Sequence, residues 1–294
     1  MREQLPTYSK ILNRRPPSIL FHYTTPIGLL GISQSNKIWA TDLRFLNDKK
    51  EFQHSLDITH SILEDFYKVN DNPKKLKGIN YDFVEYLGIN LRDNWNPKVY
   101  VASFTEKGDL LSQWRGYCPK GGFSIGFHFN LLSQIATKHN SFLLPCVYDF
   151  KIQNKILEEL LVSHSTKYDE AIKNINQKNS DELAHSISNE FIISLFALAP
   201  MLKHESFREE KEWRIVYSNL STIPDIKFRA NDSSIIPYIE ISLCQNEEEF
   251  EFKQVFIGPA SINHYSEETV LQLLRKNRVA HNAIRLSSAP YRSA

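Results

Sequence analysis

The chain has 294 residues, of which 41% are hydrophobic and 12% aromatic, and 35 Lys and Arg balance 34 Asp and Glu. This composition is ordinary for a soluble globular protein, and the length favours one or two domains. The net charge of +1 argues against a protein whose whole surface binds polyanions. It is still compatible with a local basic patch.

The cysteines and the N-terminal residues indicate a cytoplasmic protein. Cys118, Cys146 and Cys244 lie far apart and form neither a zinc-ligand spacing nor a disulfide framework. The first 18 residues are polar and basic and lack the apolar run of a signal peptide. Because no segment approaches the roughly 18 continuous apolar residues of a membrane helix, we expect no membrane association.

The N-terminal third of the chain mixes short strands with helices. Residues 1–17 are expected to be a lead-in, and the segment SILFHY (18–23) is expected to be the first strand. Thr25-Pro26 is typical of a helix N-cap followed by proline at the first helical position, so a short helix should follow. Further expected elements are a strand at 37–42, an amphipathic helix ending near Tyr67, a loop at 69–78 and a helix at 81–93.

The rest of the chain has runs of strands separated by a helical segment. Strands are expected at 98–105, 121–129, 143–150, 212–217, 226–230, 235–243 and 252–259, two helices within 152–202 and one at 266–277, and an extended segment at 283–292. Runs of like elements, rather than strict alternation, predict an α+β fold. The sequence has no repeat and no low-complexity linker, so we expect a single domain over 18–294 with a helical insertion at about 152–205.

Two predicted strands from distant parts of the chain carry polar side chains on one face. Successive side chains of a strand alternate between its faces, so His22 shares a face with Thr24, and Ser103 shares a face with Thr105. Either strand alone is typical of a half-exposed edge strand. Together with a third strand they predict one common cleft.

The third strand lies in the segment SFREEKEWRIVYS. In an extended chain Glu210, Glu212 and Arg214 share one face, while Trp213 and Ile215 point to the other and can pack in a core. The two carboxylates should then lie about 7 Å apart along the strand. A structural ion-pair ladder is the alternative interpretation of this acidic face.

The segment GDLLSQWRGYCPKGGFSIGF places an arginine beside aromatic residues. The Arg115 guanidinium could grip a phosphate while the ring of Trp114 or Tyr117 stacks on a base. The alternative is a core tryptophan next to a solvated arginine. The pair Asn47-Asp48 is most simply a turn and a helix N-cap.

These motifs resemble a known family when they are taken together. HYTT, FLNDKKEF, VASFTEKGDLLSQWRGY, GGFSIGF, FREEKEWR and the terminal SSAPYR resemble, in order and spacing, the bacterial family named domain of unknown function 2971. The resemblance runs from about Leu20 to Arg292. That family is in turn similar to the ADP-ribosyltransferase fold, which implies a split mixed β-sheet core with flanking helices.

Transferases of that fold bind NAD through three strands. The resemblance implies that His22 matches the His or Arg of a first strand, and that Ser103 and Thr105 match a Ser-x-Ser/Thr motif on a second. Glu212 then matches the catalytic Glu of a later strand, and Glu210 the preceding acidic residue of a Glu-x-Glu pair. This combination of His, Ser-x-Thr and Glu-x-Glu is a mixed pattern, which leaves the acceptor group open.

The implied roles follow the chemistry of the nicotinamide–ribose bond, whose cleavage places positive charge on the sugar. Glu212 would hydrogen-bond the ribose 2-hydroxyl, and Glu210 would deprotonate or orient the acceptor. His22, assisted by Thr24, would hold the adenosine ribose. The other expected NAD contacts are Ser103 and Thr105 as a brace for Glu212 and the ribose, Tyr23, Trp114 or Tyr117 as stacking rings, and Arg115 on the pyrophosphate.

The resemblance thus implies an NAD-dependent ADP-ribosyltransferase, with NAD as co-substrate and no metal, acting as a toxin or anti-phage effector. The near-neutral charge leaves nucleic acid and protein open as acceptors. One alternative is an NAD glycohydrolase, in which water replaces the acceptor. Another is a non-catalytic nucleotide-binding or interaction module, in which Glu210, Glu212 and Arg214 form the ion-pair ladder. The sequence leaves the oligomeric state open.

Overall fold

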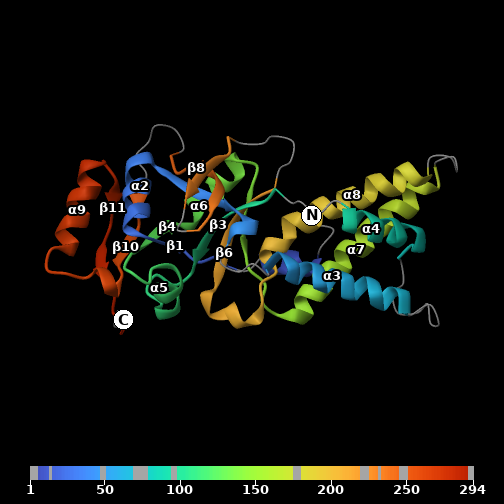
Figure 1. The fold of residues 1–294 in the computed structure, drawn as a ribbon, viewed down its shortest axis with the longest axis horizontal. Coiled ribbons are helices and arrows are strands. Elements are labelled where there is room, and N and C mark those ends of the chain that lie inside the picture. Colours follow the sequence, from blue (N-terminus) through green and yellow to red (C-terminus); the bar gives the residue numbers. More distant parts are fainter. Residues whose placement is uncertain are drawn as a thin grey trace. The chain divides into compact units, whose positions relative to one another are not determined.

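The computed structural model describes residues 6–12, 15–46, 51–68, 79–93, 98–174, 180–218, 225–230, 233–244 and 251–290. The chain divides into two compact units, each assembled from three separate segments (Figure 1). Unit 1 comprises Met1–Arg14, Leu46–Val99 and Val147–Ser206, and unit 2 comprises Arg15–Phe45, Tyr100–Cys146 and Phe207–Ala294. The residues expected as an insertion, 152–205, belong to unit 1 together with most of the expected lead-in.

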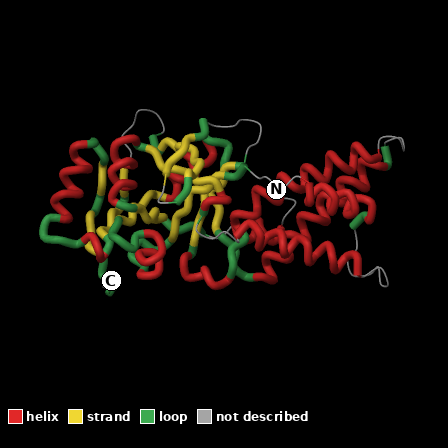
Figure 2. The backbone as a smooth tube through the Cα atoms, viewed as in Figure 1, coloured by secondary structure: helices red, strands yellow, loops and turns green. Residues whose placement is uncertain are grey.

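Unit 1 is helical in the residues that the structure describes (Figure 2). It contains α1 (Pro6–Leu12), α3 (Glu51–Lys68), α4 (Tyr81–Asp93), α7 (Phe150–Ile172), α8 (Ser180–Leu198) and the 3-10 turn η4 (Ala199–Met201). The rings of Phe83 and Tyr168 lie 6.0 Å apart in its core. α1 was not expected from the sequence, and it is fastened to α7 because the Thr7 backbone N–H donates to the Glu159 carboxylate at 3.0 Å.

α8 and the turn after it form a long apolar segment. Ser180–Met201 is long and apolar enough to cross a membrane by length and composition, although 61% of its apolar window is buried inside the protein. Phe191, Leu195 and Leu198 are fully buried. This burial is typical of the core helix of a soluble protein.

Unit 2 is built on a ten-stranded sheet. Its strands are β1 (Ile19–Thr24), β2 (Lys37–Asp42), β3 (Tyr100–Thr105), β4 (Phe123–His128), β5 (Phe142–Pro145), β6 (Glu212–Tyr217), β7 (Lys227–Ala230), β8 (Ile235–Ser242), β10 (Gln254–Ile257) and β12 (Ile284–Leu286). The order is β12-β10-β4-β1-β3-β2-β8-β7, with β6 between β3 and β5. The parallel β10–β12 pair makes the sheet mixed, which together with the helices confirms the predicted α+β class.

The sheet branches at β3. One edge of β3 pairs along its whole length with β6. Its other edge is shared, because β1 pairs through Phe21 with Thr105 and β2 pairs through Thr41 with Val101. Since β1 and β2 contact opposite ends of the same edge, β3 and β6 form the stem from which the two halves of the sheet extend.

The remaining elements of unit 2 flank this sheet. They are α2 (Pro26–Ser35), α5 (Leu111–Tyr117), α6 (Phe129–Lys138), α9 (Ser266–Lys276), the short strands β9 (Glu251–Phe252) and β11 (Ala280–His281), and the 3-10 turns η1 (Leu43–Phe45), η5 (Glu205–Glu210, which enters unit 2 at Phe207) and η6 (Pro259–Ser261). The predicted cap is confirmed, because the Thr25 hydroxyl accepts from the Gly28 N–H at 3.2 Å. Sequence reading missed α5 and α6, which are short helices between strands.

One expected element boundary changes, and others are confirmed. The strand expected at 143–150 is limited to β5, because Asp149 caps α7 by accepting the Ile152 N–H at 3.1 Å. The helix at 81–93 and the strand at 37–42 are confirmed as predicted. The predicted turn at Asn47-Asp48, the predicted loop at 69–78 and the end of the terminal SSAPYR motif (291–292) lie outside the described residues.

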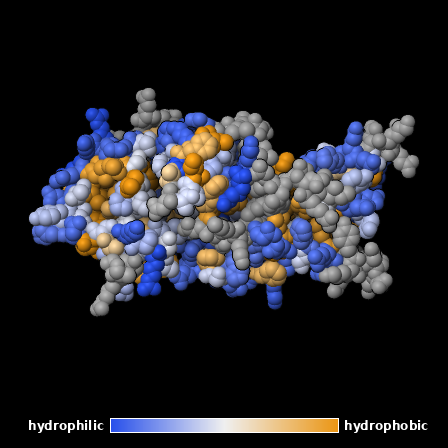
Figure 3. Space-filling view, in the orientation of Figure 1, coloured by the Kyte–Doolittle hydropathy of each residue, from blue (hydrophilic) through white to orange (hydrophobic). Residues whose placement is uncertain are grey.

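α2 is apolar on its exposed side as well as on its buried side. Leu29 and Ile32 are buried, whereas Ile27 is 80% and Leu30 43% exposed. Tyr265, just before α9, is 65% exposed. The space-filling view shows apolar surface in this region of unit 2 (Figure 3).

Candidate functional site

One pocket of unit 2 gathers side chains from β1, β3, α5, η5 and β6. It is lined by Phe21, His22, Tyr23, Ser103, Phe104, Thr105, Gln113, Tyr117, Glu210 and Glu212. Its open volume is about 60 Å³, well below the roughly 300–1,000 Å³ of a typical small-molecule pocket. As it stands, the pocket accepts one end of a ligand rather than a whole dinucleotide.

Most of the residues singled out from the sequence meet in this pocket. Those that line it are His22, Tyr23, Ser103, Thr105, Tyr117, Glu210 and Glu212; Thr24, Trp114 and Arg115 are not among the lining residues. Sequence reading missed Phe21, Phe104 and Gln113 as lining residues. The expectation that three distant chain segments converge on one cleft therefore matches the geometry.

His22 enters the pocket as a neutral imidazole. Its Nδ1 lies 2.9 Å from the Ser103 carbonyl oxygen, and because a carbonyl can only accept, Nδ1 carries the proton and Nε2 keeps its acceptor lone pair. The ring lies 5.7 Å from the ring of Phe104. Burial lowers the pKa of His22, against the opposing effect of the Ser103 hydrogen bond, and nearby Arg229 lowers it further.

Glu212 and Arg214 form a buried, two-pronged ion pair. The Arg214 Nε donates to Glu212 Oε1 at 2.7 Å and its Nη2 donates to Oε2 at 3.0 Å. The two residues are only 4% and 2% exposed. Opposite them on β3 lie Thr105 and Ser103, respectively, so four polar side chains share one face of the β3–β6 stem. The arginine takes two of the roughly four acceptor positions of the carboxylate.

Glu210 is not on the strand, which corrects the expectation from alternation. It ends the 3-10 turn η5, and β6 begins only at Glu212. Between them Lys211 has a φ of 44°, a left-handed conformation that costs a non-glycine residue on the order of 1–2 kcal/mol. The Thr105 hydroxyl donates to the Glu210 carbonyl oxygen at 2.5 Å. It therefore holds the Glu210 backbone rather than bracing the Glu212 carboxylate.

The side chains of α5 have different environments on different faces of the helix. The indole N–H of Trp114, which is 1% exposed, donates to the Asp109 carboxylate at 2.7 Å, and the ring packs edge-on against Tyr23 at 4.6 Å. Arg115 is exposed. The interpretation as a core tryptophan beside a solvated arginine thus describes this helix, whereas Gln113 and Tyr117, one turn apart, face the pocket.

Tyr23 contributes its ring to the pocket while its hydroxyl is bound elsewhere. That hydroxyl donates to the Lys107 carbonyl oxygen at 3.0 Å and accepts the Leu110 N–H at 2.9 Å. Burial raises the pKa of Tyr23 far above its ordinary value of 10.0, against the opposing Leu110 hydrogen bond. Tyr23 therefore stays protonated and fixes the loop that leads into α5.

Asp109 joins α5 to the C-terminal SSAP segment. Its carboxylate accepts from the Ser287 hydroxyl at 2.5 Å and from the Ser288 N–H and hydroxyl at 2.7 and 2.9 Å, in addition to the Trp114 indole. Burial acts to raise the pKa of Asp109, but these hydrogen bonds outweigh it and hold the pKa below its ordinary value of 3.8. Two motifs that are 178 residues apart are therefore held together by one ionised carboxylate.

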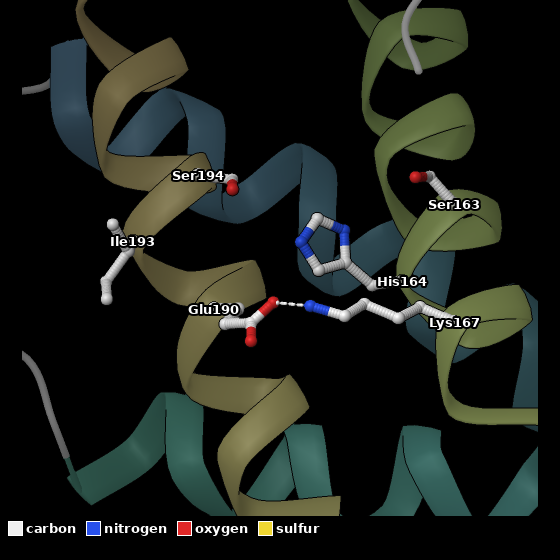
Figure 4. Close-up of a pocket in the computed structure, with 6 residues that line it drawn as sticks. All are labelled: Ser163, His164, Lys167, Glu190, Ile193 and Ser194. Atoms are coloured by element: carbon white, nitrogen blue, oxygen red, sulfur yellow. Dashed lines mark hydrogen bonds and ion pairs between the residues drawn. The ribbon is translucent and has the colours of Figure 1, made fainter. Parts of the chain in front are cut away.

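A second hollow, of about 250 Å³, lies in unit 1 between α7 and α8 (Figure 4). Lys167 of α7 and Glu190 of α8 form an ion pair across it, and both side chains are about half exposed. His164 is 6% exposed and its Nδ1 donates to the Leu160 carbonyl oxygen at 2.9 Å. Because the charged groups pair with each other and no residue expected at the site lies here, the pocket of unit 2 is the candidate site.

The described residues contain no cluster of three or more His, Cys, Asp or Glu side chains that could hold a metal ion. The acceptor groups of the unit 2 pocket, a neutral imidazole nitrogen and two carboxylates, can accept hydrogen bonds from hydroxyl groups such as those of a sugar.

Comparison with known proteins finds a family model that resembles part of the chain. No curated protein and no solved structure matches it. Residues 113–215 match the family model described as "Protein of unknown function (DUF2971)". This segment contains Gln113, Tyr117, Glu210 and Glu212, and it is shorter than the range over which the motifs resemble the family. The match confirms the predicted resemblance to this family over residues 113–215.

Proposed function

We propose that the pocket of unit 2 binds the reacting end of NAD and that the protein transfers ADP-ribose to a macromolecule. The observation that carries this proposal is the convergence of His22, Glu210 and Glu212, from opposite ends of the chain, on one pocket. The branching of the sheet at β3, beside this pocket, is of the kind expected for a split sheet. The pocket unites most of the residues expected to contact NAD, although Thr24, Trp114 and Arg115 do not line it.

The proposed reaction breaks the bond between the ribose C1 atom and the nicotinamide nitrogen. The bonding electrons leave with nicotinamide, which becomes neutral, and positive charge develops on the ribose ring. Glu212 accepts a hydrogen bond from the 2-hydroxyl, and this bond strengthens as the charge grows. The acceptor's nucleophile then bonds to C1, and Glu210, which is only partly buried, takes the acceptor's proton.

Two features of the pocket support these roles. The Nε2 atom of neutral His22 can accept a hydrogen bond from a sugar hydroxyl, which a protonated histidine could not. The Arg214 guanidinium pairs with Glu212 without taking all of the acceptor positions of its carboxylate. Since the open volume is small, the remaining part of a dinucleotide lies outside the pocket, or side chains at its mouth move to admit it.

The acceptor and setting are part of the same proposal. The near-neutral net charge leaves nucleic acid and protein open as acceptors, and modification of either suits a toxin or an anti-phage effector. The cysteines of the chain are free, as expected in the cytoplasm.

Glu212→Gln tests the proposal. The glutamine keeps the side-chain volume but removes the negative charge that stabilises the developing cation, so nicotinamide release from NAD should fall by about a hundredfold or more. The assay measures nicotinamide released by the purified protein with protein, RNA or DNA supplied as the acceptor. Undiminished release by a folded Glu212→Gln protein would rule out the assignment.

Glu209→Gln is the matched control. Glu209 precedes Glu210 in the same 3-10 turn, but it is exposed and does not line the pocket. The Glu209→Gln protein should therefore release nicotinamide at the wild-type rate. Equal release with and without an acceptor, together with free ADP-ribose as the product, would favour the glycohydrolase alternative.

A non-catalytic module remains the second candidate because one observation favours it. The ion pair of Glu212 and Arg214 is buried and joined by two hydrogen bonds within the protein itself, as in a structural pair. Absence of both NAD binding in calorimetry and nicotinamide release would favour this candidate.

A further inference from the structure

We propose that Gln113 and Tyr117 recognise a planar carboxamide, and that they make the pocket selective for the nicotinamide end of NAD over its carboxylate analogue. This inference rests on the proposed function for the identity of the ligand. Its physical basis, a buried amide on the same helix face as an aromatic ring, is independent of the reaction.

Gln113 is a buried polar side chain that faces the pocket. It is 6% exposed and is one of the lining residues. Among the described residues its carboxamide has no hydrogen-bond partner, in contrast to the nearby Trp114 indole and Tyr23 hydroxyl. Its amide atoms are not among the fully buried polar atoms without a partner in the described residues, so they open onto the pocket, where a ligand group is the natural partner for them.

Helix geometry explains why Gln113 and Tyr117 act together. They are four residues apart on α5, so they lie one above the other on the same face of the helix. Trp114, on the adjacent face, is locked by its bond to Asp109 and by packing against Tyr23. The helix is therefore anchored on its tryptophan side while its Gln–Tyr side is presented to the pocket.

The chemistry of these two side chains fits a flat heteroaromatic carboxamide. A glutamine amide offers one carbonyl acceptor and an NH₂ donor, and a ligand carboxamide offers the same two groups for a reciprocal pair of hydrogen bonds. The Tyr117 ring can lie against the aromatic ring that carries the carboxamide. A carboxylate in the same place has no N–H to donate to the Gln113 oxygen.

The charges around the pocket add to this discrimination. Glu210 and Glu212 are acidic, Arg214 offsets one of them, and His22 is kept neutral by burial. A neutral carboxamide, or the cationic nicotinamide ring of NAD, is therefore better accommodated than an anionic carboxylate.

The test compares nicotinamide with nicotinate as probes for the full chain, by calorimetry or ligand-observed NMR. Wild type should bind nicotinamide at least about tenfold more tightly than nicotinate, since a site built to hydrogen-bond a group rejects analogues that lack it. Gln113→Leu and the similarly sized Gln113→Met should each reduce this preference to less than about threefold. Gln134→Leu, an exposed position on α6, is the matched control and should keep the preference.

Thermal unfolding of each variant is measured as a control, so that a reduced preference for nicotinamide in a folded variant can be distinguished from unfolding. The proposal is overturned if wild type binds neither probe, if it binds both equally, or if folded Gln113 variants keep the wild-type preference. Nicotinamide release from NAD, measured on the same preparations, separates the two ideas. A preference for nicotinamide over nicotinate without nicotinamide release from NAD would support the Gln113 site and contradict the transferase function.

Discussion

At the scale of single residues, Glu212 and Arg214 carry both a structural and a proposed chemical role. Their side chains are 4% and 3% exposed, so either charge left alone would be buried without its partner. Glu212→Met should therefore lower the free energy of unfolding by about 3–5 kcal/mol, whereas the double change with Arg214→Met should recover most of that loss. Urea unfolding of both single variants and the double variant measures this coupling.

A different outcome of the urea experiment would contradict this prediction. Additive losses, with the double variant no more stable than the less stable single variant, would show that the two side chains are held by other groups rather than by each other.

Single residues also show where sequence reasoning succeeds. Alternation along a strand correctly placed Ser103 and Thr105 on one face, because β3 is regular over both positions. The same rule failed for Glu210, because Lys211 adopts a left-handed conformation between a 3-10 turn and the strand. The local residue types do not indicate this left-handed conformation, since lysine has no preference for positive φ.

At the scale of elements, α5 shows what was missed and why. The strand-rich surroundings conceal a short helix, so the sequence pattern points to Trp114 as a ligand contact and not to Gln113. Once the segment is helical, the spacing of Gln113 and Tyr117 places both on the pocket side. A helical period across SQWRGY was the signal that could have found Gln113.

The α7–α8 pair contains a histidine that should make unit 1 sensitive to acid. Burial is the main cause that lowers the pKa of His164; its bond to Leu160 and the charge of Glu190 oppose this, while Lys167 adds to it. The folded protein therefore resists protonation at a pH where an unfolded histidine, with an ordinary pKa of 6.5, accepts a proton. Stability is thus full above about pH 6.5 and decreases as the pH falls below it.

His164→Gln should flatten this dependence. The difference in urea midpoint between about pH 7.5 and about pH 5.5 should be smaller in the variant than in wild type. Burial also lowers the pKa of His22 and His139, so part of the wild-type dependence should remain. An unchanged difference in the variant would show that His164 does not contribute.

At the scale of the whole molecule, the α+β class was predictable because runs of strands and helices can be read from residue patterns. The grouping into two units is less apparent in the sequence. Unit 1 consists of three segments separated by stretches of unit 2. The apolar face of a helix indicates that the helix packs in a core, but it does not identify the element on the other side of the contact. The convergence of the site residues was expected from the polar faces of strands and from the family resemblance together.

The proposal that unit 2 handles NAD is tested most directly by isotopically labelled NAD. Cell extract is incubated with the labelled compound and the protein, and mass spectrometry follows the ADP-ribose label. The proposal predicts label covalently attached to a protein or nucleic acid with wild type and Glu209→Gln, and its loss with Glu212→Gln. Label that stays entirely on intact NAD in the presence of wild type, as in extract alone, would contradict it.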